Sequence, residues 1–92
     1  MNDNRAPLTD LAKRLEPLCA HVSVRDDDGT SFLFAVGLRH VHSLELRRKG
    51  AASVVELWRA PRNHDEFIAK QRLHSLEDAA QRCEQWLRND AT

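Results

Sequence analysis

The spacing of apolar residues changes twice along the chain, and this change constrains the fold more than any other feature. Near both ends, apolar residues recur every three or four positions, which is the period of an amphipathic α-helix. Between residues 21 and 73 they alternate with polar residues, which is typical of strands with one buried face. The sequence therefore predicts a helix at each end and a group of short strands between the two.

The first predicted helix covers residues 8–16 and follows a polar segment, residues 1–6, that we expect to be frayed. Pro17 should end this helix, because proline lacks an N–H and its ring clashes with the carbonyl four residues earlier. The last helix is predicted over residues 75–89, where Ser75 and Asp78 have the spacing of a capping box. Its apolar stripe includes four residues that we expect to lie against a sheet: Leu76, Ala80, Cys83 and Leu87.

Five segments have the alternation of strands: residues 21–27, 31–37, 43–49, 53–59 and 66–73. Asp28-Gly29 is a typical hairpin turn, and Lys49-Gly50 provides another turn. The last of the five segments is also compatible with an extension of the C-terminal helix. The sequence therefore leaves open whether the sheet has four strands or five.

Short connections make consecutive strands antiparallel neighbours, and a meander with one apolar face needs a cover. The two terminal helices each offer an apolar stripe for that purpose. We therefore expect a two-layer α+β sandwich, with an antiparallel meander and both helices on one of its faces. A chain of 92 residues is expected to form one domain.

The alternation also predicts which side chains face the helices. In residues 31–37 we assign Phe32, Phe34 and Val36 to the covered face, which leaves Leu33 and Ala35 on the outer face.

Trp58 is expected beside them on the outer face, although it could instead turn inward and fill the core. A partly apolar outer face would be a surface for a partner, and tryptophan offers a large contact area at a small cost in entropy. The predicted interface residues are therefore Trp58, Leu33 and Ala35.

The residues capable of metal binding or catalysis do not form a recognisable site. On a regular strand His40 and His42 would share one face, but a zinc ion needs three or four ligands, and no further ligand has a suitable spacing. We therefore interpret both as polar residues in a connection between two strands. The two cysteines, Cys19 and Cys83, are interpreted as reduced, buried thiols. The sequence has no P-loop, GxSxG, GxGxxG or HExxH motif. We therefore expect no metal, no cofactor and no enzymatic activity.

Charge is balanced over the whole chain but not along it. Fourteen basic and fourteen acidic side chains cancel, so that net charge attracts neither nucleic acid nor a membrane. Residues 39–72, however, contain eight Lys or Arg against four Asp or Glu. This surplus makes phosphate or nucleic-acid contact an alternative, although sheets that bind RNA usually carry stacking aromatic residues. The candidate cations are Arg47, Arg48, Lys49, Arg59 and Arg62.

Taken together, these patterns favour a small non-enzymatic interaction module whose partner is another protein or a second copy of itself, as a homodimer. A nucleic-acid-binding domain is the alternative, and a small enzyme or metal-binding protein comes third. The longest apolar run is too short to cross a bilayer, and the first ten residues contain no apolar segment of a secretory signal. We therefore expect a cytoplasmic protein without a membrane partner.

Overall fold

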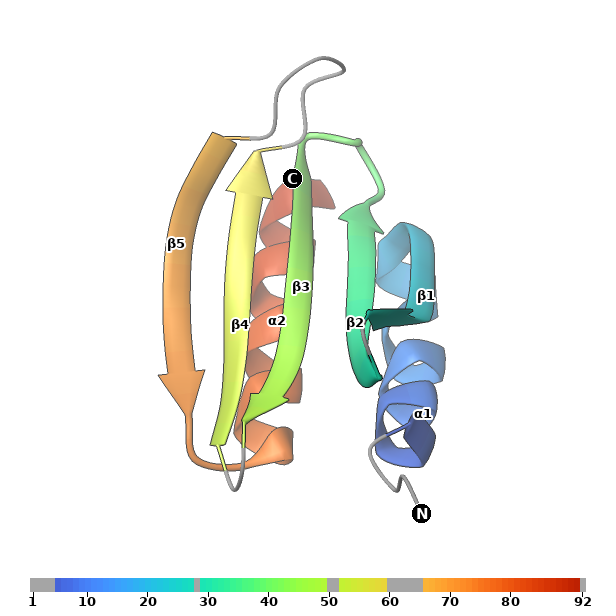
Figure 1. Ribbon diagram of the computed structural model, residues 1–92. Coiled ribbons are helices and arrows are strands. Elements are labelled where there is room, and N and C mark those ends of the chain that lie inside the picture. Colours follow the sequence, from blue (N-terminus) through green and yellow to red (C-terminus); the bar gives the residue numbers. More distant parts are fainter. Residues whose placement is uncertain (1–4, 28, 50–51, 60–65, 92) are drawn as a thin grey trace.

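A computed structural model of the chain describes residues 5–27, 29–49, 52–59 and 66–91 (Figure 1). Five strands form one antiparallel sheet with the order β1-β2-β3-β4-β5. Both helices lie on the same side of this sheet (Figure 1). The elements are α1 (Arg5–Leu15), a 3₁₀ turn (Glu16–Leu18), β1 (Cys19–Asp27), β2 (Thr30–Gly37), β3 (His42–Lys49), β4 (Ala52–Arg59), β5 (Glu66–Leu73) and α2 (Leu76–Ala91).

This architecture confirms the predicted two-layer α+β fold, and the segment of residues 66–73 is a strand rather than part of a helix. The bounds of the elements differ from the predicted ones by at most three residues, and those of β5 coincide with them. Residues 1–4 of the segment expected to be frayed lie outside the described residues, whereas residues 5 and 6 belong to α1.

Local sequence signals explain where the helices start and end. Helix α1 ends at Leu15, and Pro17 lies in the 3₁₀ turn, where its missing N–H interrupts no α-helical hydrogen bond. At the start of α2, the hydroxyl of Ser75 accepts a hydrogen bond from the backbone N–H of Asp78 at 3.1 Å. Gly29 has a φ of 81° in the turn between β1 and β2, a conformation that glycine adopts without strain.

Strand pairing determines the two faces of the sheet. Asp27 pairs with Thr30 across a two-residue turn, and this register continues so that Val24 lies opposite Leu33. Leu33 in turn pairs with Leu46, and Leu46 with Val55. Because paired residues of an antiparallel ladder point to the same face, these side chains form one row beneath the helices.

The predicted orientation of β2 was therefore wrong. Leu33 and Ala35 have no exposed surface and belong to the core, so they are not available as interface residues. Phe32, Phe34 and Val36 point away from the helices instead. The pairing with Val22 and Val24 decides the matter, because these two valines lie against the core.

The core lies between the sheet and the two helices. Ala80, Cys83 and Leu87 of α2 are at most 2% exposed, and Leu76 packs against them while partly buried, which confirms that this stripe faces the sheet. Helix α1 contributes a matching stripe at a spacing of three and four residues. The fully enclosed members of the core include Leu8, Leu15, Leu33, Leu44, Leu46 and Val55.

Candidate functional site

The outer face of the sheet is the surface that the helices leave uncovered (Figure 1). Register and alternation place aromatic and aliphatic side chains on this face from β2 and β4, which flank β3 with its polar residues Ser43, Glu45 and Arg47. The apolar side chains are only partly exposed, and Val54 is 7% exposed, because neighbouring side chains lie over them. This outer apolar cluster consists of Phe32, Phe34, Val36, Val54 and Trp58.

Two arginines lie directly over the phenylalanine rings of the cluster. The guanidinium carbon of Arg47 is 4.1 Å from the ring centroid of Phe32, and that of Arg25 is 4.4 Å from the centroid of Phe34. Such cation–π contacts contribute about 0.5–1 kcal/mol each at exposed sites. They hold each guanidinium over a ring, and its five N–H donors allow further contacts.

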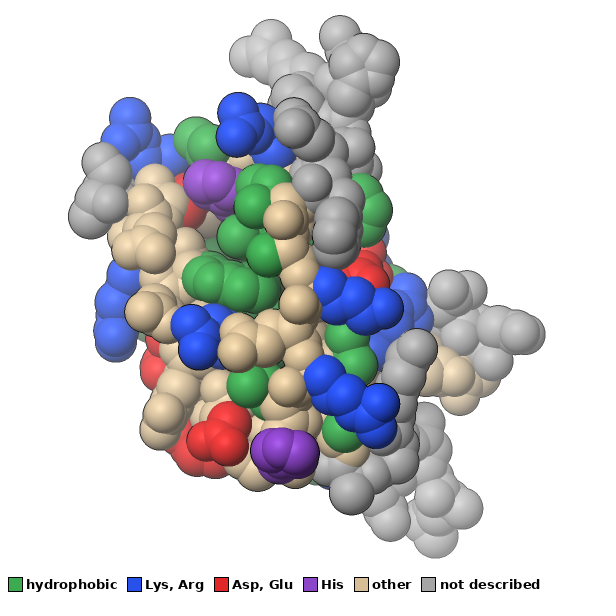
Figure 2. Space-filling model, turned by 90° about the vertical axis from the view of Figure 1, so that its left-hand side faces the viewer, with side chains coloured by type: hydrophobic (Ala, Val, Ile, Leu, Met, Phe, Trp, Pro, Cys, Tyr) green, Lys and Arg blue, Asp and Glu red, His purple; other side chains and the backbone are tan. Residues whose placement is uncertain are grey.

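Charges of both signs alternate with the apolar side chains. Glu45 and Glu56 lie directly opposite each other on β3 and β4, an arrangement that is repulsive by itself. A basic neighbour offsets each of them: Nη2 of Arg47 is 3.1 Å from a carboxylate oxygen of Glu45, and Nζ of Lys70 is 3.9 Å from one of Glu56. Figure 2, viewed from the β5 edge, shows Lys and Arg side chains along the outer face on its right-hand side.

The five cations that the sequence predicted as phosphate contacts do not lie together in the structure. Arg47 is on the outer face, whereas Arg48 and Arg59 alternate with outward-facing neighbours and lie on the face of the helices. Lys49 ends β3, but its side chain is outside the described residues, and so is Arg62 as a whole. The five cations therefore do not form one patch.

Trp58 lies on the outer face, as one of the two alternatives for it predicted. It pairs with Ser43 and is half-buried, while Val55 and Leu57 point towards the helices. The bulge between Leu57 and Trp58 on the β5 side does not change this orientation.

A buried carboxylate on the helix side of the sheet was not predicted. The side chain of Asp90, in the last turn of α2, has no exposed surface. One carboxylate oxygen accepts the backbone N–H of Arg39 at 2.9 Å, and the other accepts the backbone N–H of His42 at 2.8 Å and its Nδ1–H at 3.0 Å. A Cβ on Gly37 would collide with this carboxylate. Asp90 therefore ties the connection between β2 and β3 to the end of α2.

The sequence contains a signal for this site that alternation alone does not reveal. Asp90 continues the apolar stripe of α2 at a spacing of three residues from Leu87 and seven from Cys83. A carboxylate on a stripe that is otherwise buried must find donors, because an unpaired buried charge is costly. The donors here are the backbone N–H groups of a turn in which His40 has a φ of 58°.

The predicted histidine pair does not meet at one point of the structure. His42 opens β3 and is oriented by Asp90, whereas His40 is exposed in the preceding turn. No group of three or more His, Cys, Asp or Glu side chains suited to a metal ion occurs in the described part of the chain. His42 and Asp90 act as a structural link between two elements.

Both thiols are free, and burial lowers their reactivity. Desolvation raises the pKa of Cys19 to about 11 and that of Cys83, which is completely buried, to about 12. The nucleophilic form of cysteine is the thiolate, so neither residue is activated as a nucleophile near neutral pH.

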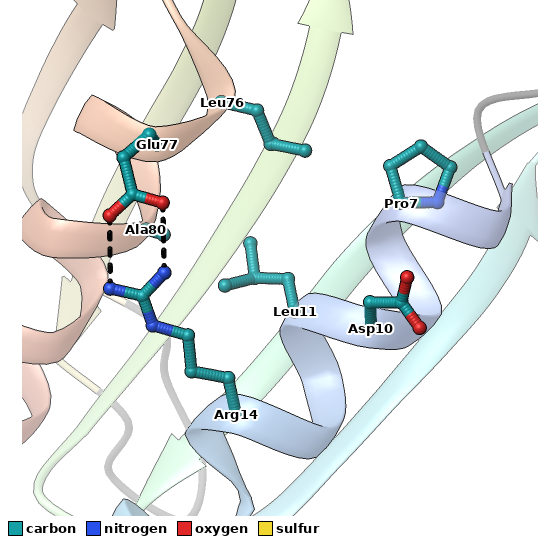
Figure 3. Close-up of a pocket in the computed structure, with 7 residues that line it drawn as sticks. All are labelled: Pro7, Asp10, Leu11, Arg14, Leu76, Glu77 and Ala80. Atoms are coloured by element: carbon teal, nitrogen blue, oxygen red, sulfur yellow. Dashed lines mark hydrogen bonds and ion pairs between the residues drawn. The ribbon is translucent and has the colours of Figure 1, made fainter.

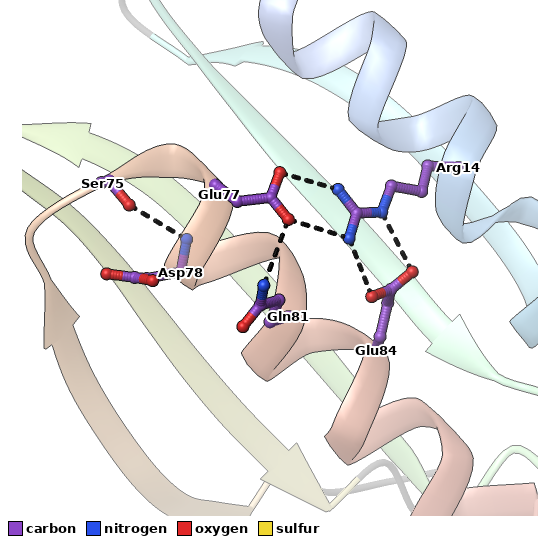
Figure 4. A network of polar contacts seen from close by, with 6 residues as sticks. All are labelled: Arg14, Ser75, Glu77, Asp78, Gln81 and Glu84. Carbon is purple, nitrogen blue, oxygen red and sulfur yellow. Dashed lines mark hydrogen bonds and ion pairs between the residues drawn. The ribbon is translucent and has the colours of Figure 1, made fainter.

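A groove of about 390 Å³ separates α1 from the start of α2 (Figure 3). Leu11, Leu76 and Ala80 form its apolar floor. At one side Arg14 binds Glu77 and Glu84 through four hydrogen bonds of 3.0 to 3.2 Å (Figure 4). The guanidinium lowers the pKa of both carboxyl groups. This network fastens the two helices to each other across the groove.

Comparisons of the chain with protein family models, with curated proteins and with solved structures found no match. Among the described helices, neither is long and apolar enough to cross a membrane. The outer face of the sheet carries aromatic, aliphatic and charged side chains suited to binding.

Proposed function

We propose that this protein is a small non-enzymatic interaction module that binds protein, and first of all a second copy of itself, through the outer face of its sheet. The observation that carries the proposal is the outer apolar cluster, Phe32, Phe34, Val36, Val54 and Trp58, on a face that neither helix covers. Aromatic side chains on an uncovered face of this kind are enriched at protein interaction sites.

The composition of the face supports the proposal. Tryptophan, phenylalanine and arginine are the residue types that protein interfaces favour, and tryptophan and arginine often dominate the binding free energy. Strands of eight or nine residues, five strands wide, span about 26 Å by about 20 Å. This is an area of about 520 Å², which corresponds to the smaller interfaces of weak or transient complexes.

A cytoplasmic location remains part of the proposal. Both cysteines are free, and reduced thiols are the rule in that compartment.

A single-stranded nucleic acid is a second candidate for the same face, because of one specific observation. Arg25, Arg47 and Arg72 lie in one row across the sheet, with Phe32 between the first two. Bases stack on aromatic rings and on guanidinium planes, and arginines bind phosphates. The sequence did not predict stacking aromatic residues on this face, but β2 provides Phe32 and Phe34 there.

Sedimentation velocity over a range of protein concentrations tests the first candidate. The wild type is expected to dimerise, and Trp58→Ala is expected to raise the dimer dissociation constant by at least about tenfold while the chain stays folded. Leu38→Ala is a control, because Leu38 is 46% exposed in the turn after β2 and is not part of the outer apolar cluster, so its truncation should leave the dissociation constant unchanged.

Two results would count against the proposal: a wild type that stays monomeric at the highest concentration, or a Trp58→Ala chain that self-associates like the wild type. Fluorescence anisotropy with labelled single-stranded RNA and DNA tests the second candidate. Binding that weakens steeply with salt in a monomeric wild type would favour nucleic acid over protein.

A further inference from the structure

The outer face carries two adjacent rows of side chains with opposite charge. The arginine row runs across the five strands as Arg25, Phe32, Arg47, Val54 and Arg72. The glutamate row runs beside it as Ser23, Phe34, Glu45, Glu56 and Lys70. The rows are two residues apart along each strand, which corresponds to about 6.7 Å.

From this pattern we infer that two copies of the chain pack face to face about a two-fold axis that lies between the two rows and parallel to them, so that Arg47 of each copy binds Glu45 of the other. This inference rests on the self-association proposed above and specifies its geometry. It names the pair of residues that determines how the two copies are aligned.

The symmetry follows from the positions of the charges. A two-fold axis between the rows places the arginine row of one copy over the glutamate row of the other, and each strand over its own equivalent. Arg47 and Glu45 are both on β3, so Arg47 of one copy lies over Glu45 of the other copy. In the same way, Phe32 of one copy lies over Phe34 of the other. An isologous interface requires self-complementarity of this kind.

Arg47 can make the contact without giving up the one it already has. Its side chain is 32% exposed, and that of Glu45 is 27% exposed, so both present polar atoms at the surface. A guanidinium has five N–H donors in a fixed fork, and a carboxylate can accept four hydrogen bonds. Two arginines and two glutamates can therefore form one closed cluster across the axis, with Phe32 holding Arg47 in place at 4.1 Å.

The other positions of the rows agree with this arrangement. Val54 would lie over Glu56, whose charge Lys70 already offsets within the same chain. Within these two rows, the only like charges that meet are Arg72 and Lys70 on β5, and both are exposed at the edge of the sheet, where water and salt weaken their repulsion.

Charge reversal in single chains and in mixtures tests the inference by sedimentation velocity at about 0.1 M NaCl. Arg47→Glu and Glu45→Arg should each raise the homodimer dissociation constant by at least about tenfold, because each places like charges together twice. An equimolar mixture of the two variants should dimerise again, since one chain then carries two glutamates and the other two arginines. The double variant Glu45→Arg/Arg47→Glu should dimerise like the wild type.

Several outcomes would overturn the inference. If the single variants dimerise as well as the wild type, or if the mixture fails to associate, then Arg47 and Glu45 do not meet across the axis. If Trp58→Ala still weakens the dimer, such a result does not contradict the proposed function. A monomeric wild type overturns both.

Folding is checked for each chain by circular dichroism and urea unfolding. If a reversed chain does not fold, Glu45→Gln and Arg47→Gln replace it, because they remove the charge at nearly constant volume. Each should weaken the dimer by a smaller factor than the corresponding reversal. A lack of any effect from both would contradict the pairing.

Discussion

Replacing Asp90 should release the connection between β2 and β3 from helix α2. In Asp90→Ala, the backbone N–H groups of Arg39 and His42 and the Nδ1–H of His42 all lose their acceptor. Because the carboxylate accepts all three bonds, Nδ1 of His42 carries the proton in this arrangement.

The magnitude follows from the number of bonds and from their exposure. A hydrogen bond to a charged group contributes about 1.5–3 kcal/mol, and a buried donor left without an acceptor costs about 1–3 kcal/mol. Arg39 lies in an exposed turn, so water can replace the acceptor of its N–H, whereas His42 is partly buried. We therefore expect Asp90→Ala to lower the free energy of unfolding by about 2–4 kcal/mol.

Urea unfolding, followed by tryptophan fluorescence and circular dichroism, measures this free energy. Hydrogen exchange adds a local test, because the N–H groups of Arg39 and His42 should be protected in the wild type and lose protection in Asp90→Ala. Arg88→Ala, an exposed change in the same part of α2, should stay within about 0.5 kcal/mol of the wild type. A loss of less than about 1 kcal/mol in Asp90→Ala, or unchanged protection of both N–H groups, would refute the assigned role.

Gly37→Ala probes the same contact from the opposite side. A Cβ at this position would lie 2.8 Å from Cβ of Asp90 and would overlap its carboxyl group, so the aspartate would have to move. The substitution is expected to cost about 1–3 kcal/mol in the wild type and clearly less in Asp90→Ala, where the obstructing group is gone. Equal costs in the two backgrounds would show that the strain of Gly37→Ala arises elsewhere.

The remaining predictions concern titratable side chains. Thiol labelling at pH 8 should be slow in the native state, because the pKa values of about 11 for Cys19 and about 12 for Cys83 leave little thiolate; rapid labelling before unfolding would contradict their burial. Arg14 lowers the pKa of Glu77 and Glu84, so their contribution to stability is present above the ordinary carboxyl pKa of about 4.3 and is lost as the pH falls through the lowered values. In Arg14→Gln the urea midpoint should therefore fall less steeply with acidification than in the wild type. The difference should shrink in about 1 M NaCl, since the pairs are exposed; identical pH profiles would contradict the role of Arg14.

The order and type of the elements could be read from the sequence because they depend on local chemistry. The periods of three to four and of two residues reflect how side chains project from a helix and a strand. Ser75 and Pro17 mark helix ends through hydrogen bonds and steric clashes within a few residues. These causes act over one turn of chain, so no tertiary contact was needed to identify them.

The faces of β2 depended on pairing with other strands. Residues 32 to 36 are apolar at every position, so alternation within the strand gives no preference between Phe32 and Leu33. The turn at Asp28-Gly29 held the missing information, because a two-residue turn that pairs Asp27 with Thr30 also pairs Val24 with Leu33. The aromatic residues of β2 therefore lie on the outer face and not on the covered face as predicted, and the candidate site includes them.

The tertiary structure alone brought Asp90 to the turn before His42, and Arg25, Arg47 and Arg72 into one row. Each of these arrangements joins residues that are more than twenty positions apart, and each depends on the register of a sheet or on the point where a docked helix ends. Local periodicity carries no information on such distances. The sequence by itself therefore determined the elements and their order, and the pairing of strands and the docking of helices decided which side chains meet, because both depend on long-range packing.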